Sequence, residues 1–241
     1  MGPYSAPIGD GVGGEVPHTG TTIIAVAYEG GIVIGCDTRV SIGNYINNRS
    51  SDKITPLADL IFLARSGSAP DTQLVADYVR HMVHQHSIER DGEAPEVRTV
   101  ATLCKQLVYN NKGMNQGHGL SAAMICAGWD KHNGGQVFGL PIGGTLMECP
   151  WAIDGSGSTY IWGYMDAEYK QGMTREETED FCIRAISLAM ARDGSSGGMV
   201  RLVTVDESGA TRKLVTCEEM EPFFEDLDVR GLRTGMGGIA I

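Results

Sequence analysis

The segment Gly20-Thr21-Thr22-Ile23-Ile24-Ala25-Val26 decides the fold, because a polar leader ends at its glycine and an apolar strand begins at its first threonine. Threonine, isoleucine and valine branch at Cβ and favour the extended backbone. A second apolar run, residues 32–37, follows the turn Glu29-Gly30-Gly31. Two such runs around a glycine turn are typical of a β-hairpin, so paired strands are predicted over 22–28 and 32–37.

Strand and helix patterns come in blocks along the rest of the chain. Further strands are predicted over 53–57, 60–66, 121–129, 135–142, 199–206 and 210–216, with a short one within 147–154. Helices are predicted from Ser68, over 96–111, from 159 towards 169, and from the capping box at Thr174. Strands first and last with helix pairs between them, and no βαβ alternation, favour a layered α+β domain. Periodicity alone leaves the order of the layers open.

The first helix has a predicted start and a predicted face. Ser68 is expected to cap it, with the acid Asp71 three residues on. A loop is predicted from Ile88 to Pro95. Apolar residues follow the start at helical spacing: Leu74, Val75, Tyr78, Val79 and Met82.

Composition limits the class of protein. The 241 residues are 42% hydrophobic and 20% charged, enough for one buried core. The formal net charge is −11, and loss of the leader with Asp10 and Glu15 would leave −9. This balance argues against nucleic-acid binding, and no apolar run approaches the ~20 residues that span a bilayer. The first twenty residues lack the pattern of a secretory signal. Six cysteines without paired spacing are expected to be reduced core thiols of an intracellular protein rather than a disulfide framework.

Five more motifs follow Gly20-Thr21 in order: Gly35-Cys36-Asp37-Thr38-Arg39, Ser51-Asp52-Lys53, Arg65-Ser66-Gly67-Ser68, Gly155-Ser156-Gly157-Ser158 and Asp193-Gly194-Ser195-Ser196-Gly197-Gly198. In this order and spacing they resemble a proteasome β subunit of the 20S core particle, an N-terminal-nucleophile hydrolase. The resemblance implies a four-layer αββα sandwich. It implies a propeptide over 1–20, removed by self-cleavage between Gly20 and Thr21, and a proteolytic domain over 21–224. Residues 225–241 lie beyond the family pattern and are expected to form a mobile tail.

The resemblance implies a threonine protease with Thr21 as nucleophile and Asp37 and Lys53 beside it. A threonine hydroxyl needs a base within hydrogen-bond reach. A free α-amino group, with an ordinary pKa of ~7.7–8.0, can serve near neutral pH, and a nearby ammonium lowers that pKa further. Taken singly, a strand threonine, a turn aspartate and a lysine are usually structural. The matched set is what points to catalysis.

Other motif residues are assigned supporting roles by the same resemblance. Gly67 is the expected oxyanion donor, since a glycine before a helix start lets the backbone approach closely. Ser156, Asp193 and Ser196 match polar residues near the nucleophile. The Gly155–Gly157 stretch lacks the Walker lysine and the dinucleotide fingerprint, so nucleotide binding is not expected.

Substrate preference is predicted from Arg65, at the position where the family has a residue in the base of the specificity pocket. A guanidinium there favours carboxylates. Together with 43–49, this resembles the caspase-like type, which cleaves after acidic residues. Ser41 matches a position that contacts the substrate backbone, and Ser51 is also assigned to substrate binding. Val40 is more apolar than the family pattern, which leaves pocket detail open.

The resemblance implies α and β subunits in stacked seven-membered rings as partners, with regulatory caps acting through the whole particle. Unfolded polypeptides are the expected substrates, and the cytoplasm and nucleus the expected location. No cofactor, nucleic acid or membrane partner is expected. A metal site is not expected either, because His81, His84 and His86 do not share one helix face. Two alternatives stay open: a structural ring subunit that never matures, and a small-molecule amidohydrolase.

Overall fold

The computed structural model describes residues 20–111 and 120–220. The expectations for the propeptide (other than Gly20), for 221–224 and for the C-terminal tail lie outside these residues. Over the described ranges the chain forms two five-stranded antiparallel sheets, a separate two-stranded hairpin and four α-helices.

The first sheet carries the segment that opens the folded chain. Its order is β10-β1-β2-β11-β12, with every neighbouring pair antiparallel. The predicted hairpin is confirmed, since Ile23 of β1 pairs with Cys36 of β2. The bounds of the strands are β1 (Ile23–Tyr28), β2 (Gly31–Asp37), β10 (Trp151–Asp154), β11 (Val200–Asp206) and β12 (Gly209–Val215).

The second sheet has the order β5-β6-β7-β8-β9 and is also antiparallel. The predicted short strand within 147–154 divides into two, because β9 joins this sheet while β10 joins the first. That single stretch therefore crosses between the layers. The bounds are β5 (Ile54–Ala58), β6 (Ile61–Gly67), β7 (Ala122–Asp130), β8 (Gly134–Leu140) and β9 (Met147–Glu148).

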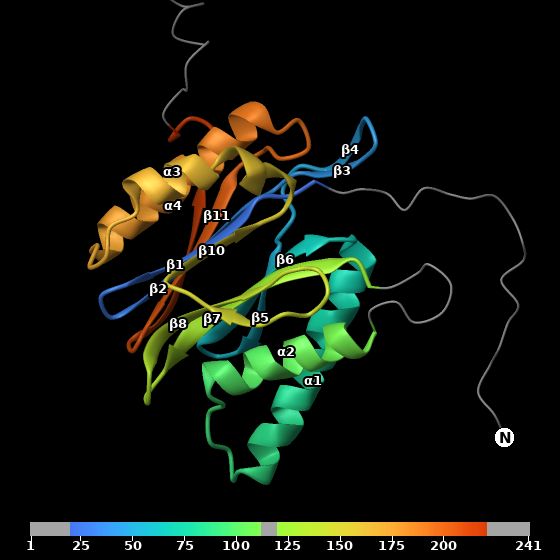
Figure 1. Ribbon diagram of the computed structural model, residues 1–241, viewed down its shortest axis with the longest axis vertical. Coiled ribbons are helices and arrows are strands. Elements are labelled where there is room, and N and C mark those ends of the chain that lie inside the picture. The colour runs from blue at the N-terminus through green and yellow to red at the C-terminus, as the bar shows by residue number, and fades with distance from the viewer. Residues whose placement is uncertain (1–19, 112–119, 221–241) are drawn as a thin grey trace, which may run out of the picture.

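Helices cover the outer face of each sheet, as Figure 1 shows. Helices α1 (Ala69–Glu89) and α2 (Val97–Asn110) pack on the second sheet. Helices α3 (Trp162–Glu168) and α4 (Arg175–Arg192) lie against the first. Among the described residues the apolar core divides into three clusters, one under each helix pair and one between the sheets. The αββα sandwich is confirmed.

Helix α1 departs from its predicted face and cap. Val75 and Val79 are buried, but Leu74 and Tyr78 are 62% and 57% exposed, because the buried stripe runs through 72, 75, 76, 79 and 83. Ser68 is the N-cap residue, yet its side chain makes no capping hydrogen bond, and Asp71 instead accepts from the Ser121 N–H. The helix also runs to Glu89, beyond the predicted loop start.

Other local predictions have mixed outcomes. The capping box at Thr174 is confirmed by reciprocal hydrogen bonds with Glu177. The helix predicted from 159 starts as a 3₁₀ turn over Ser156–Tyr160 before α3. The hairpin β3 (Val40–Ile42) and β4 (Tyr45–Asn48) was not predicted.

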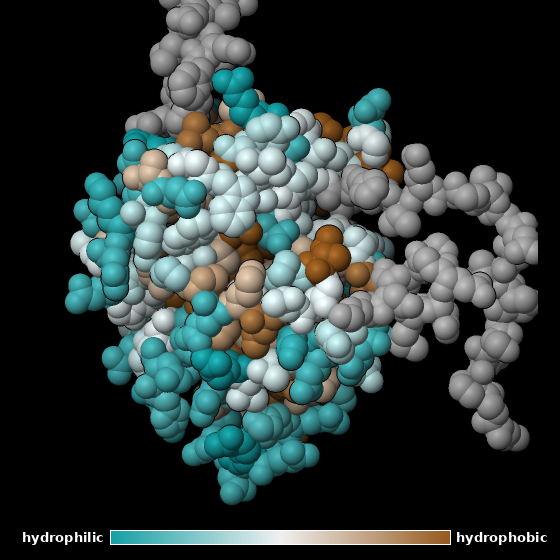
Figure 2. Space-filling model, in the orientation of Figure 1, coloured by the Kyte–Doolittle hydropathy of each residue, from teal (hydrophilic) through white to brown (hydrophobic). Residues whose placement is uncertain are grey.

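The cysteines follow the predicted core placement only in part. All six are free thiols, and four are buried: Cys36, Cys104, Cys126 and Cys182. Cys149 is half-buried and Cys217 is exposed, so these two are not core thiols. On the face drawn in Figure 2, brown hydrophobic patches lie near the middle, while the lower part, over the helices of the second sheet, is largely teal. Within the described residues, no helix is both long and apolar enough to cross a bilayer.

Candidate active site

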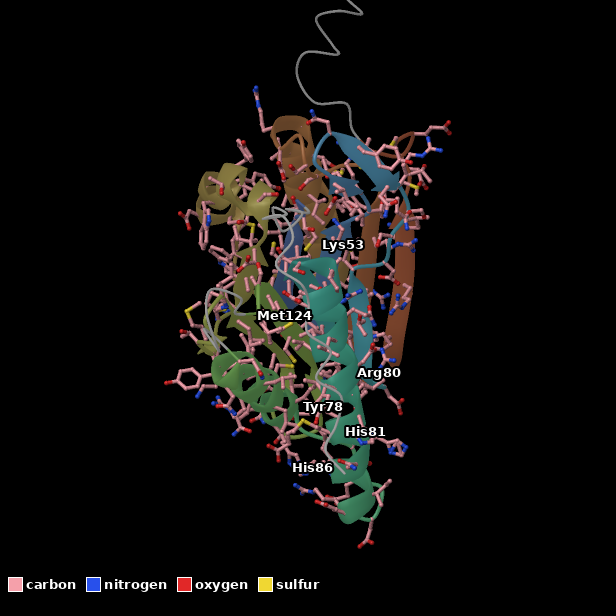
Figure 3. The ribbon with its side chains drawn as sticks, turned by 90° about the vertical axis from the view of Figure 1, so that its right-hand side faces the viewer. Lys53, Tyr78, Arg80, His81, His86 and Met124 are labelled. Atoms are coloured by element: carbon pink, nitrogen blue, oxygen red, sulfur yellow. The ribbon has the colours of Figure 1, made fainter. Side chains whose placement is uncertain are left out.

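Residues from four separate elements converge where β1 begins. Thr21 precedes β1, Asp37 ends β2, Lys53 precedes β5, and Gly67 ends β6. Figure 3 shows Lys53 beyond the upper end of α1, with Tyr78, Arg80, His81 and His86 further down that helix. The sheets therefore bring together four predicted residues that lie apart in the sequence.

Thr21, Lys53 and Asp37 form a continuous buried chain of contacts. Lys53 Nζ lies 3.1 Å from Thr21 Oγ1 and 2.8 Å from Asp37 Oδ1. Thr21 Oγ1 in turn donates to the Gly20 carbonyl oxygen at 2.7 Å, and Lys53 Nζ lies 3.5 Å from that oxygen. The Gly20–Thr21 bond is intact here, so the hydroxyl and the ammonium both face the carbonyl group of that bond.

The Asp37 carboxylate is fixed from both sides. Oδ1 accepts from the Thr22 N–H at 2.9 Å as well as from Lys53. Oδ2 accepts from the N–H groups of Arg39 at 3.2 Å and Gly197 at 3.0 Å. A buried carboxylate needs such partners, and Asp37, which has no exposure to water, accepts hydrogen bonds from four donors.

Ser156, Asp193 and Ser196 make a second network beside the nucleophile. Both serine hydroxyls donate to Asp193 Oδ2, at 2.7 and 2.6 Å, and the Thr21 N–H donates to Ser156 Oγ at 3.1 Å. Burial of Asp193 acts to raise its pKa, but the hydrogen bonds from Ser196, Ser156 and the Ser195 N–H outweigh it and hold the pKa below its usual value. The network therefore keeps a carboxylate behind the nitrogen of Thr21.

Gly67 occupies a position that requires glycine. Its φ is +107°, and a Cβ there would overlap the Ser121 carbonyl oxygen. Helix α1 begins two residues later, and its N-terminus adds positive potential near the carbonyl that would be attacked. The backbone here can approach a substrate closely, as an oxyanion donor must.

A small pocket of about 50 Å³ opens beside Thr21. Arg65 lines it, and burial lowers the pKa of Arg65 although Asp52 acts to raise it. Its Nη2 donates to the Asp52 carbonyl at 3.2 Å, whereas its buried Nε has no hydrogen-bond partner. The lining residues are Thr21, Val40, Ser51, Lys53, Arg65, Gly67, Ala69 and Thr72.

Two residues predicted to bind substrate differ in their position relative to this pocket. Ser51 lines the pocket, but Ser41 does not; it lies in β3 opposite Ile46 and is 6% exposed. Its neighbour Val40 takes the place on the pocket wall. A larger cavity of about 590 Å³ at the far end of α1 contains His84 but none of the candidate catalytic residues. In the part of the chain that the structure describes, no three His, Cys, Asp or Glu side chains gather as a metal site.

The sequence patterns missed several contacts that hold the site. Thr22 Oγ1 and Ser196 Oγ lie 2.8 Å apart, and Arg39 Nη1 donates to the Gly194 carbonyl at 3.1 Å. These bonds tie the 193–198 loop to Thr22, just before β1, and to Arg39, two residues after the end of β2. The only signal for Thr22 in the sequence was a second threonine directly after Thr21. The contacts of the 193–198 loop could not be predicted, because they depend on the pairing of β2 with β11.

Comparison with known proteins agrees with this geometry. The family model described as proteasome subunit matches residues 17–205. Proteasome subunit beta type-6 of Arabidopsis thaliana is 47% identical over 215 residues, covering 89% of this chain and 90% of the relative. Proteasome subunit beta type-9 of Homo sapiens is 46% identical, covering 92% and 98%. Proteasome subunit beta type-6 of Dictyostelium discoideum is 46% identical, covering 86% and 94%.

Proposed function

The chain belongs to the proteasome β-subunit family, and on that premise we propose that it is a catalytic subunit of the core particle, a threonine endopeptidase with Thr21 as nucleophile. The observation that carries this proposal is the contact of Lys53 Nζ with both Thr21 Oγ1, at 3.1 Å, and Asp37 Oδ1, at 2.8 Å. A subunit kept only for its interfaces has no need of a buried lysine aimed at a hydroxyl.

The first reaction in the proposal is self-cleavage at Gly20–Thr21. Thr21 Oγ attacks the Gly20 carbonyl carbon, the C–N bond breaks, and the hydroxyl proton passes to the Thr21 nitrogen. Water then hydrolyses the resulting ester, leaving a carboxylate on Gly20 and a free hydroxyl and α-amine on Thr21. Lys53, beside Oγ1 and the Gly20 oxygen, is the residue that can assist the proton transfer and stabilise the oxyanion.

Peptide hydrolysis uses the α-amine that self-cleavage releases. The neutral amine takes the Oγ proton as Oγ attacks the substrate carbonyl, and the leaving amine of the substrate receives a proton as the acyl ester forms. Water then hydrolyses the ester. Ser156 Oγ, 3.1 Å from the Thr21 nitrogen, would orient the amine, and the Gly67 N–H with the start of α1 would stabilise the oxyanion.

We further propose a preference for cleavage after acidic residues. The similarity to type-6 and type-9 relatives is nearly equal, so it selects no specificity. The preference rests on Arg65, which lines the pocket beside Thr21. A guanidinium there would favour a substrate carboxylate through charge and forked hydrogen bonds.

Membership of the family implies assembly with other proteasome subunits in the core particle. Seven-membered rings, regulatory caps, unfolded polypeptide substrates and a place in the cytoplasm and nucleus remain part of the proposal. The test is the mass of the chain in assembled particles whose other catalytic subunits are inactivated. Wild-type and Thr21→Ser chains should begin at residue 21, whereas Thr21→Ala should retain residues 1–20. A wild-type chain that keeps its leader would favour the structural ring subunit.

A further inference from the structure

Gly20 packs directly against Ser195, a residue 175 positions later in the chain. A Cβ added to Gly20 would overlap Ser195 Cβ and would lie 2.9 Å from Ser195 Cα and 2.9 Å from Ser156 Oγ. A hydroxyl oxygen can rotate away, but a Cβ is fixed to its backbone. The obstacle that excludes a side chain at position 20 is therefore mainly the Cβ of Ser195.

Ser195 is held in this place by its loop. Its N–H donates to Asp193 Oδ1 at 3.0 Å, and the following Ser196 N–H donates to the Asp193 carbonyl at 3.2 Å. On the other side, Arg39 Nη1 binds the Gly194 carbonyl at 3.1 Å. Anchored before and after, the backbone at Ser195 is not free to retreat from a larger residue 20.

We propose that Ser195 is a positioning residue for self-cleavage, whose Cβ restricts position 20 to glycine and holds the Gly20 carbonyl beside Thr21 Oγ1. The inference rests on the proposed function, since self-cleavage is the reaction that it serves. Ser195 acts through Gly20 and does not touch the reacting hydroxyl. The loop that binds Ser156 through Asp193 would then also select the residue before the scissile bond.

The consequence for the reaction is geometric. The Gly20 oxygen receives Thr21 Oγ1 at 2.7 Å and faces Lys53 Nζ at 3.5 Å. Any side chain at position 20 must move away from Ser195 and carry the carbonyl carbon with it. A misplacement of about 1 Å costs a reaction about 100-fold, so Gly20→Ala should slow self-cleavage by about that factor.

The experiment follows loss of residues 1–20 by mass over time, in assembled particles whose other catalytic subunits are inactivated. Gly20→Ala is made alone, with Ser195→Gly, and with Ser195→Ala. Ser195→Gly removes the obstructing Cβ and should restore at least about tenfold of the ~100-fold loss. Ser195→Ala removes only the hydroxyl, keeps the Cβ, and should restore nothing.

Other outcomes are equally decisive. Equal rescue by Ser195→Ala, or no rescue by Ser195→Gly in assembled particles, would overturn the inference. If Ser195→Gly fails to assemble, the series Gly20→Ala and Gly20→Val decides: the rate should fall with side-chain size, and a rate independent of size overturns the inference. A wild-type chain that is never cleaved refutes the proposed function itself, which separates the two failures.

Discussion

Lys53 donates to Asp37 across 2.8 Å, and the two side chains are only 7% and 0% exposed. The two side chains differ in their other hydrogen-bond partners. Asp37 also accepts from three backbone N–H groups, whereas the other contacts of Lys53 Nζ are to Thr21 Oγ1 and the Gly20 oxygen. The carboxylate thus holds the ammonium, and the ammonium is aimed at the bond to be broken.

The first prediction concerns Lys53→Ala. Removing one member of a buried pair leaves the other charge uncompensated, which costs roughly 3–5 kcal/mol, and the three backbone donors should keep the loss near 3. Self-cleavage and peptide hydrolysis should both fall severely. Lys53→Arg should regain most of the stability but little activity, because its planar fork has a different donor geometry. Urea unfolding, chain mass and peptide hydrolysis measure the three effects. Near-normal hydrolysis by a Lys53→Ala chain produced with Thr21 as its first residue would remove Lys53 from the mechanism.

The second prediction uses the opposite pKa shifts of two aspartates. The pKa of Asp193 is lowered in the fold, so its stabilising contribution is present above its unfolded-state pKa and is lost as the pH falls through the folded value. Burial raises the pKa of Asp154, so its ionisation makes stability fall as the pH rises from its unfolded-state pKa towards the folded value.

Stability measured from neutral pH down to about pH 3 should separate the two variants, since aspartate titrates near ~3.9 when unfolded. Asp193→Asn should lose stability at neutral pH and depend less on acid than the wild type. Asp154→Asn is the matched control and should remove a penalty that the wild type carries at neutral pH. Parallel stability curves for Asp193→Asn and the wild type would contradict the proposed hydrogen-bonded carboxylate.

The third prediction contrasts two helix caps that look alike in the sequence. Thr174 accepts from the Glu177 N–H at 3.3 Å, so Thr174→Ala should destabilise the fold by about 1 kcal/mol. Ser68 makes no side-chain capping hydrogen bond, so Ser68→Ala should lose no cap and should cost less than Thr174→Ala. Both differences can be read from urea unfolding of the full chain. Equal losses would mean that the cap at Ser68 forms in solution.

The same pair of caps shows how far the sequence could be interpreted. The pattern of a cap with an acid three residues on occurs at both helices, but at α1 the acid is taken by a distant backbone group, the Ser121 N–H. Strands β1 and β2 were predictable because β2 and the first four residues of β1 are buried and read as apolar runs in the sequence. The hairpin strand β4 is exposed throughout and leaves no apolar pattern to find.

The candidate site was likewise only partly predictable from the sequence. The family resemblance of the motifs was enough to predict Thr21, Asp37 and Lys53, which the fold brings into contact. Contacts such as Gly197 N–H to Asp37, or Gly20 against Ser195, depend on the register of β2 with β11 and on loop packing across some 160 residues or more. No local pattern encodes such a meeting, because each residue is ordinary in its own segment.

The last prediction concerns substrate preference and rests on Arg65. A carboxylate bound to this guanidinium should gain a charge-assisted hydrogen bond of roughly 1.5–3 kcal/mol, or about one to two orders of magnitude in preference for Glu over an apolar residue. Arg65→Met should abolish most of that preference and leave self-cleavage intact, since Arg65 contacts neither Thr21 Oγ1 nor the Gly20 oxygen.

The measurement for Arg65 is hydrolysis of matched fluorogenic peptides ending in Glu, Leu or Arg, by assembled particles whose other catalytic subunits are inactivated. Arg80→Met is the control, because Arg80 is an exposed arginine on α1 whose Nε binds the Pro56 carbonyl away from the pocket beside Thr21. It should keep the wild-type preference. Rapid cleavage after Leu with none after Glu would refute the post-acidic assignment. The proposed chemistry of Thr21 and Lys53 would stand, because it does not depend on the identity of the substrate side chain.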